Sequence, residues 1–240
     1  MSVPRKGILM AGGRGSRLLP LTADCNKHLL PVRGEAMILH PLRTLLELDI
    51  RDIALVTNPA DIPAFKALLG DGSSRTCCIH YLPQPEPAGV AQGLLLAADF
   101  LAGSSSILIL GDNFFKASSP ALFREALASA ADEAVLFCRE LARPGDYGVL
   151  RRNASGQPQS IVEKPRDAAS GLVITGLYGY PADAPSFAAR LRPSSRGELE
   201  ISDLNQLYLE AGRLHAFDLP EDCVWLDLGT HTGLEQAKAL

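Results

Sequence analysis

Residues 7–32, GILMAGGRGSRLLPLTADCNKHLLPV, contain the most informative pattern in this chain. The short apolar run at residues 8–10 predicts a buried strand, and the three glycines within residues 12–15 predict a tight turn after it. Backbone N–H groups in such a turn can point at phosphate oxygens, and two cations, Arg17 and Lys27, follow closely. The combination suits a nucleoside triphosphate, although a plain strand–helix connection would use the same glycines. No Gly-Lys-Ser/Thr closes the loop, so it is not a Walker motif.

The bulk composition of the 240 residues is that of a globular protein. Hydrophobic residues make up 47% and charged residues 21%, which is typical of a chain that buries a core. The formal net charge of −4 argues against general nucleic-acid binding, because that class favours a basic surface. The five cysteines show no zinc-site spacing, which predicts free thiols in a reducing compartment. Neither a signal peptide nor a membrane span is evident, so we expect a cytoplasmic protein without a membrane partner.

Strand and helix patterns alternate along the first half of the chain. Strands are expected at residues 8–10, 53–57, 79–82, 107–110 and 134–138, and helices at 42–48, 62–69, 90–101 and 122–130. The second half has expected strands at residues 147–151, 160–163, 172–180 and 223–226, with helices at 202–211 and from 234 onward. This order predicts an α/β, Rossmann-like three-layer αβα fold around a mixed, mainly parallel sheet. We expect one domain over residues 1–240.

Two carboxylates each follow an apolar run, which is where ligands bind in parallel sheets. Asp112 comes after residues 107–110, and Asp227 comes after residues 224–226. Two carboxylates at two strand ends can hold one hard cation through oxygen, and Mg²⁺ is the ion expected beside phosphates. Asp112 could instead be a helix cap or a turn residue.

The whole run at residues 7–32 resembles the signature of the sugar-1-phosphate nucleotidylyltransferases, AGG-x-G-[ST]-R-L-x-P-L-T, then Lys, then LLPV. Further blocks match this family in the same order. They are GDN at residues 111–113, EKP at 163–165, RGELEISD at 196–203 and WLDLGT at 225–230. The similarity is strongest to the glucose-1-phosphate thymidylyltransferases, and within that group to a short form without the C-terminal helices that longer members use in subunit contacts and an allosteric nucleotide site.

The resemblance implies an Mg²⁺-dependent nucleotidyl transfer from dTTP or UTP to a sugar 1-phosphate, with glucose 1-phosphate as the expected acceptor. A phosphate oxygen of the sugar attacks the α-phosphorus in line, and pyrophosphate leaves. The attacking phosphate is already anionic, so catalysis consists of positioning and electrostatic stabilisation. Arg17 is thereby assigned to the leaving pyrophosphate and the transition-state charge, Lys27 to the α-phosphate or the attacking group, and Lys164 to the sugar phosphate.

The resemblance also implies the remaining contacts, with residues 1–140 binding the nucleotide and residues 141–240 the sugar phosphate. The implied nucleotide contacts are Ala11, Gly12, Gly13, Gly15, Ser16, Arg17, Gln84, Gly89 and Asp112. The implied sugar-phosphate contacts are Tyr147, Gly148, Glu163, Lys164, Thr175 and Glu198, and the implied metal ligands are Asp112 and Asp227. The Gln84 amide can pair with the edge of a pyrimidine, but would otherwise be a solvated loop residue. His28 and Leu228 depart from common family residues, Gln and Thr.

Other functions stay open at this point. The same fold could act on another phosphate-bearing acceptor or triphosphate, or serve as a catalytically silent nucleotide sensor. The presence of all five charged groups argues against the sensor; these are Arg17, Lys27, Asp112, Lys164 and Asp227. A metal-dependent glycosyltransferase would carry a D-x-D motif, whereas residues 112–114 read Asp-Asn-Phe. The choice between dTTP and UTP, the sugar and a homo-oligomeric state are left undecided.

Overall fold

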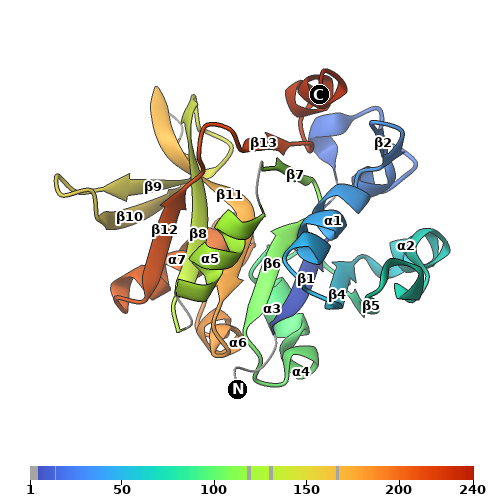
Figure 1. Ribbon diagram of the computed structural model, residues 1–240, viewed down its shortest axis with the longest axis horizontal. Helices are drawn as coiled ribbons and strands as arrows, with labels where there is room; N and C mark the ends of the chain where they lie inside the picture. The colour runs from blue at the N-terminus through green and yellow to red at the C-terminus, as the bar shows by residue number, and fades with distance from the viewer. Residues whose placement is uncertain (1–4, 14, 118–119, 130–131, 166–167) are drawn as a thin grey trace.

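The computed structural model describes residues 5–13, 15–117, 120–129, 132–165 and 168–240 (Figure 1). Within them, nine strands form one sheet whose main path runs β10-β9-β11-β6-β1-β4-β5, with β8 beside β11 and β12 beside β8. The strands are β1 (Lys6–Met10), β4 (Asp52–Thr57), β5 (Cys78–Pro83), β6 (Ser106–Leu110), β8 (Ala134–Ala142), β9 (Gly148–Arg152), β10 (Pro158–Glu163), β11 (Ser170–Tyr180) and β12 (Leu214–Asp218).

The sheet is mixed, as the sequence predicts. Strands β6, β1, β4 and β5 run parallel to their neighbours in the first half of the chain. Strand β11 reverses this direction and pairs antiparallel with β6, β8 and β9. The predicted α/β fold with a mixed central sheet is therefore confirmed. Parallel pairing of β1 with both β4 and β6 places β1 in the interior of the sheet, which explains why its residues 7–10 are all buried.

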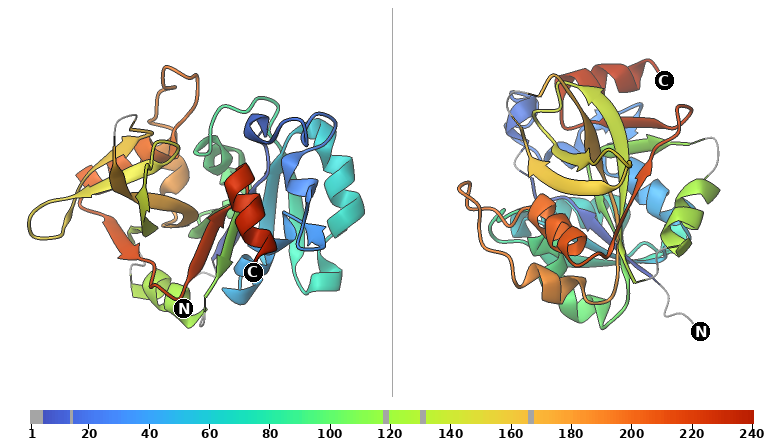
Figure 2. Two further views of the ribbon diagram at one scale, coloured as in Figure 1. Left: turned by 90° about the horizontal axis from the view of Figure 1, so that it is seen from above. Right: turned by 90° about the vertical axis from the view of Figure 1, so that its left-hand side faces the viewer.

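Helices cover both faces of this sheet (Figure 2). The helices are α1 (Leu39–Glu47), α2 (Ile62–Leu69), α3 (Gln92–Leu96), α4 (Ala98–Leu101), α5 (Ala121–Ser129), α6 (Ala184–Ala188), α7 (Ile201–Glu210) and α8 (His231–Lys238). Side chains alternate across a strand, so Leu9 of β1 packs in the cluster with α1, α2 and α5, whereas Ile8 packs in the cluster with α3, α6 and α7. Two apolar layers flanking one sheet give the predicted three-layer arrangement.

Several elements differ from the sequence-based expectation. The helix expected at residues 90–101 is divided into α3 and α4, because Ala97 leaves helical geometry at φ −90° and ψ 3°. Strand β12, helix α6 and the short strand β7 (Asn113–Lys116) were not predicted. Strand β7 is only four residues long, and its partner β13 (Val224–Asp227) lies more than a hundred residues away. No local sequence pattern therefore predicts it. Ala130, the expected end of one helix, lies outside the described residues.

Two strand pairings bring the acidic motifs together. Met10 of β1 lies opposite Leu110 of β6, and the Gly111 N–H continues this contact by donating to the Met10 carbonyl at 2.8 Å. The glycine loop and Asp112 therefore leave the sheet side by side, at the carboxyl ends of parallel strands. The pairing of β13 with β7 sets Asp227 opposite Asn113. In the described part of the chain, no helix is long and apolar enough to cross a membrane.

Candidate active site

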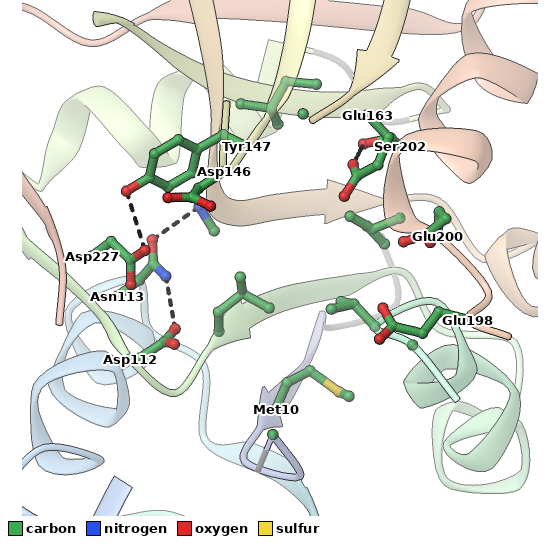
Figure 3. Close-up of a pocket in the computed structure, with 18 of the residues that line it drawn as sticks. Met10, Asp112, Asn113, Asp146, Tyr147, Glu163, Glu198, Glu200, Ser202 and Asp227 are labelled. Atoms are coloured by element: carbon green, nitrogen blue, oxygen red, sulfur yellow. Dashed lines mark hydrogen bonds between the residues drawn. The ribbon is translucent and has the colours of Figure 1, made fainter. Parts of the chain in front are cut away.

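A pocket of about 290 Å³ opens at the carboxyl ends of β1 and β6 (Figure 3). Both halves of the chain contribute to its walls. From the first half come Gly12, Gly13, Arg17, Lys27, Gln84, Gly89 and Asp112, and from the second come Tyr147, Gly148, Glu163, Lys164, Glu198 and Asp227. Thirteen of the predicted site residues thus line one cavity, although the sequence separates them by up to 215 positions.

Asp112 stands at the floor of this pocket with 6% of its surface exposed. Burial is the largest single influence and would raise the pKa of its carboxyl group, but the charges of Lys27 and His28 and the hydrogen bonds from Lys27 and Asn113 together hold that pKa below its usual range. Lys27 Nζ donates to Asp112 Oδ2, and the Asn113 amide donates to Oδ1 at 3.1 Å. Asp112 is therefore an ionised, oriented carboxylate.

Asp227 faces the same space from the end of β13. Its burial and the charge of Asp112 raise the pKa of the Asp227 carboxyl group, while Arg17, at 3.5 Å from Oδ2, opposes this rise. The Gly229 N–H donates to Oδ1 at 2.9 Å, and the Tyr147 hydroxyl donates to Oδ2 at 3.1 Å. Two buried carboxylates thus repel each other across a gap, which is the arrangement that a cation relieves.

Asn113 fixes the direction of Asp112, and the sequence analysis did not assign it to the site. Its Oδ1 accepts from Trp225 Nε1 at 2.6 Å and from the Gly176 N–H at 3.0 Å. Both partners can only donate, so the amide oxygen must face them and the NH₂ group must face Asp112 (Figure 3). The signal was present, since Asn113 belongs to the GDN block.

The glycine loop divides into residues that line the pocket and residues that shape the loop. Gly12 and Gly13 line the pocket, whereas Ala11, Gly15 and Ser16 do not. The buried Ala11 accepts from Thr57 Oγ1 at 3.0 Å through its carbonyl. Gly15 has a φ of 68°, which favours glycine, and begins the short 3₁₀ turn that carries Ser16 and Arg17. These residues hold the loop in place, so the backbone at Gly12 and Gly13 reaches the cavity.

The opposite wall carries Lys164, Glu163 and Glu198 from the second half. Lys164 has a φ of 45°, an uncommon conformation for a residue with a side chain, and its N–H donates to the Tyr147 carbonyl at 3.0 Å. Its ammonium lies 3.5 Å from Glu163 Oε1. Such local strain is concentrated at functional sites in proteins. Here the strained residue carries a partly exposed ammonium group at the wall of the cavity.

Arg196 is a pocket residue that the sequence analysis placed in the RGELEISD block without assigning it to the site. Its guanidinium reaches three carboxylates: Glu163 at 3.1 Å, Glu198 at 3.5 Å and the buried Glu200 at 2.7 Å. The Ser202 hydroxyl donates to the second oxygen of Glu163 at 2.5 Å. Charges separated in sequence therefore form one connected polar wall, which only the fold reveals.

Thr175 lies outside the pocket-lining residues. Its side chain is fully buried, and its hydroxyl donates to the Phe137 carbonyl at 2.8 Å, away from the cavity. Its neighbour Gly176 lines the pocket instead. Alternation along β11 turns successive residues to opposite faces of the sheet, which accounts for the difference.

A second polar cluster lies at the opposite end of the parallel strands from the pocket. Asp52, Cys78 and His80, at the starts of β4 and β5, bring possible ligand atoms within 4.8 Å of one another. His80 Nε2 already pairs with Asp52 Oδ1 at 2.8 Å, and Lys6 Nζ lies 3.5 Å from Asp52 Oδ2. The carboxylate therefore has cationic and polar partners without a metal.

Comparison with known proteins places this chain within a family. The family model for nucleotidyl transferases matches residues 6–240. Glucose-1-phosphate thymidylyltransferase of Neisseria meningitidis (serogroup A / serotype 4A) is 44% identical over 235 residues, which cover 97% of this chain and 81% of that protein. The enzyme of the same name from Mycobacterium tuberculosis (H37Rv) is 40% identical, covering 97% of this chain and 80% of that protein.

Solved structures show the same fold. A Bacillus anthracis protein described as a glucose-1-phosphate thymidylyltransferase, in complex with a sucrose, aligns with a TM-score of 0.89 and 36% identity over 98% of this chain and 94% of that one. A UDP-glucose pyrophosphorylase complexed with UDP-glucose aligns at 0.85, with 22% identity over 99% and 98% of the two chains, and shares the fold. The resemblance drawn from the motifs is confirmed: the chain belongs to the nucleotidyl transferase family of enzymes.

Proposed function

We propose that this chain transfers a thymidylyl group from dTTP, or a uridylyl group from UTP, to the phosphate of glucose 1-phosphate and releases pyrophosphate. The observation that carries the proposal is a single pocket that combines two buried carboxylates with the cations Arg17, Lys27 and Lys164. Polyphosphate reactants need such charges, because like-charged phosphates must approach each other in the reaction. Glucose 1-phosphate and the thymidylyl group are those in the name of the relatives at 40–44% identity.

The two carboxylates fit Mg²⁺, a hard cation that takes carboxylate oxygens together with substrate phosphates. Asp112 is held ionised. Burial and the charge of Asp112 raise the pKa of Asp227, and a bound cation would lower it by stabilising the carboxylate. In the structure, Lys27 and Arg17 pair with these carboxylates. Mg²⁺ bound there would supply positive charge to phosphate oxygens. Neutralised carboxylates would leave Lys27 and Arg17 free to contact phosphates.

The chemistry assigned to the protein's own residues follows from where they stand. Backbone N–H groups at Gly12 and Gly13 would receive the triphosphate, with Arg17 on the leaving pyrophosphate. Lys164 stands on the opposite wall and would hold the sugar phosphate. Residues 1–140 would thus bind the nucleotide and residues 141–240 the sugar phosphate, and the two phosphates would meet in line above Asp112. Positioning and charge stabilisation then lower the barrier without a protein nucleophile.

Gly229 is expected to be required because any side chain here would meet both carboxylates. A Cβ at this position would lie 2.6 Å from Asp112 Oδ2 and 2.9 Å from Asp227 Oδ1. Gly229→Ala should therefore push the carboxylates apart and raise the half-saturating Mg²⁺ concentration by about tenfold or more. The measurement is a Mg²⁺ titration of initial rate. Gly145→Ala is the matched control, since its Cβ would meet only ordinary contact at 3.5 Å. Equal Mg²⁺ requirements in the two variants would contradict the assignment.

Lys164 is expected to set the affinity for the sugar phosphate. Its ammonium is 39% exposed and would form a charge-assisted contact with phosphate. Lys164→Met should raise the KM for glucose 1-phosphate by about 10- to 100-fold, since such contacts contribute about 1.5–3 kcal/mol. The KM for dTTP should change much less. Lys116→Met, at an exposed position on β7, is the control. A larger effect on dTTP than on the sugar would reverse the assignment of the two walls.

Release of pyrophosphate by purified protein with Mg²⁺ tests the proposed function. Each of dTTP, UTP, CTP, ATP and GTP is supplied with and without glucose 1-phosphate. Release that requires the sugar phosphate and occurs with dTTP or UTP supports the proposal and identifies the base. Release with only a different phosphate acceptor would keep the chemistry and change the substrate. Triphosphate binding without release, across a broad panel of acceptors, would overturn it.

A further inference from the structure

We propose that Gln92 is a positioning residue that fixes the orientation of the Gln84 amide, and that this orientation selects a pyrimidine carrying N3–H over cytosine. The inference rests on the proposed function, because it takes the Gln84 side of the pocket as the place where the base binds. Gln92 begins α3 and does not line the pocket, so it acts only through Gln84.

Hydrogen bonds to Gly89 and Gln92 hold the Gln84 amide. Gln84 follows β5 directly, is only 2% exposed, and its backbone N–H donates to the Thr57 carbonyl at 2.7 Å. Its side-chain Nε2 donates to Gln92 Oε1 at 2.7 Å and to the Gly89 carbonyl at 3.3 Å. The two hydrogens of the NH₂ group thus have two acceptors, and neither is directed at a ligand.

A backbone carbonyl determines which way both amides point. Gln92 Oε1 accepts from Gln84 Nε2 at 2.7 Å, so its oxygen follows the direction of the Gln84 NH₂ group. The Ala88 N–H lies 3.3 Å from the same oxygen but donates at 2.8 Å to the Glu86 carbonyl, so it does not fix that direction. The Gly89 carbonyl can only accept, so the NH₂ group of Gln84 must face it. A flipped Gln84 would set its oxygen against two acceptors at once, Gly89 O and Gln92 Oε1. Gln92 supplies the second of these acceptors and so holds Gln84 in one state.

The oxygen of the Gln84 amide is left for the ligand. Among the described residues, no hydrogen bond reaches Gln84 Oε1. This oxygen lies over the glycine loop, since a Cβ built on Gly12 would be 2.0 Å from it. Gly12 and Gln84 both line the pocket. The pocket therefore presents an acceptor, and not a donor, at the place where the amide meets the loop.

An acceptor at this place discriminates between pyrimidines. Thymine and uracil carry a hydrogen on N3 and can donate it to Gln84 Oε1. Cytosine has a lone pair on N3, which would face the amide oxygen and leave both groups without a hydrogen. A site built around one hydrogen bond rejects an analogue that cannot make it, because the buried polar group loses its partner. The amide could serve cytosine only if it rotated, and Gln92 prevents that rotation.

The test compares dUTP with dCTP, which share the same deoxyribose and differ only at the base edge. The kcat/KM for each is measured with Mg²⁺ and glucose 1-phosphate. Gln92→Leu keeps a bulky side chain, one heavy atom shorter, that accepts no hydrogen bond, so we expect the dUTP/dCTP ratio to fall by about tenfold or more. Gln92→Glu still accepts from both Ala88 and Gln84, so we expect its ratio to stay within about threefold of the wild type. Gln236→Leu, at an exposed position on α8, is the matched control.

The outcomes separate a positioning role from a structural one. A role in positioning changes the ratio and leaves the KM for glucose 1-phosphate within about twofold, since that substrate lies on the opposite wall. If Gln92→Leu lowers kcat/KM by the same factor for dUTP and for dCTP, so that the dUTP/dCTP ratio is unchanged, the inference is overturned. A wild-type protein that uses both nucleotides equally well would also overturn it. Gln92→Ala gives the same comparison if the leucine variant does not fold.

Failure of the proposed function is distinguished by binding. If the wild-type protein releases no pyrophosphate, calorimetric titration with dUTP and dCTP gives the ratio of dissociation constants for the wild type and the same variants. A wild-type preference for dUTP that Gln92→Leu removes and Gln92→Glu keeps would support the inference although the transfer reaction had failed. Equal affinities for the two nucleotides would overturn it on its own ground.

Discussion

Asp112→Asn is expected to lower kcat/KM by about 10³-fold while the protein stays folded. The substitution removes one of the two charges proposed to hold Mg²⁺, and it also removes the charge that pairs with Lys27. The side chain keeps its shape and an oxygen that can still accept from Asn113, so this hydrogen bond survives, whereas the one from Lys27 to Oδ2 is lost. The loss of kcat/KM should therefore come from the missing charge and not from unfolding. Raising the Mg²⁺ concentration should recover part of the activity.

The measurement for Asp112→Asn is steady-state kinetics of pyrophosphate release, with circular dichroism to verify folding. Asp99→Asn, an identical change at an exposed position on α4, should match the wild type. A variant at Asp112 that retains kcat/KM within about threefold of the wild type would show that the carboxylate pair is not the centre of the reaction. A variant that unfolds would instead indicate that the ion pair with Lys27 is needed for stability.

Arg17→Met is expected to lower kcat by about 10²- to 10³-fold with little change in stability. Arg17 is 45% exposed, and its 3.5 Å contact with Asp227 is a weak ion pair in this structure. Such half-exposed pairs contribute about 1 kcal/mol or less to folding, so the free energy of unfolding should hardly change. The guanidinium is expected to matter when charge develops on the leaving pyrophosphate. Loss of such a contact lowers kcat and kcat/KM together.

Arg124→Met is a closely matched control for Arg17→Met. Arg124, on α5, is 48% exposed and pairs with Asp49 at 2.7 Å. The variant therefore loses a comparable surface ion pair. Both variants are compared by single-turnover rates and by urea unfolding. A similar small kinetic effect in the two would remove Arg17 from the proposed chemistry. A rise in the KM for dTTP at constant kcat would limit Arg17 to ground-state binding.

The identity of the local elements could be predicted from the sequence. The apolar run at residues 8–10 and the glycines after it specify a strand and a tight turn, and both occur. The helix expected at residues 62–69, with Gly70 after it, is found as Ile62–Leu69. These features depend on neighbouring residues, on side-chain periodicity and on the φ that glycine permits. Family motifs added the residues proposed for the site.

Tertiary structure decided how those residues meet. Asp227 reaches the site because β13 pairs with β7 in a register that sets it opposite Asn113, and nothing local to either four-residue strand encodes that register. The same pairing brings Trp225 onto Asn113, which then orients Asp112. Thr175 turned away from the pocket because strand alternation places only one of two neighbours on each face.

The sequence by itself therefore determined the α/β class, the strand ends that carry charge, and the family. Only the tertiary structure decided that Lys27 became the partner of Asp112, and that Arg17 and Tyr147 became partners of Asp227. The physical reason is that strand propensity and turn geometry are short-range properties, whereas the position and charge of a buried side chain depend on partners far away in the chain. Hydrogen bonds from Gly176 to Asn113 and from Tyr147 to Asp227 are made by the fold, after long-range pairing has set the distances.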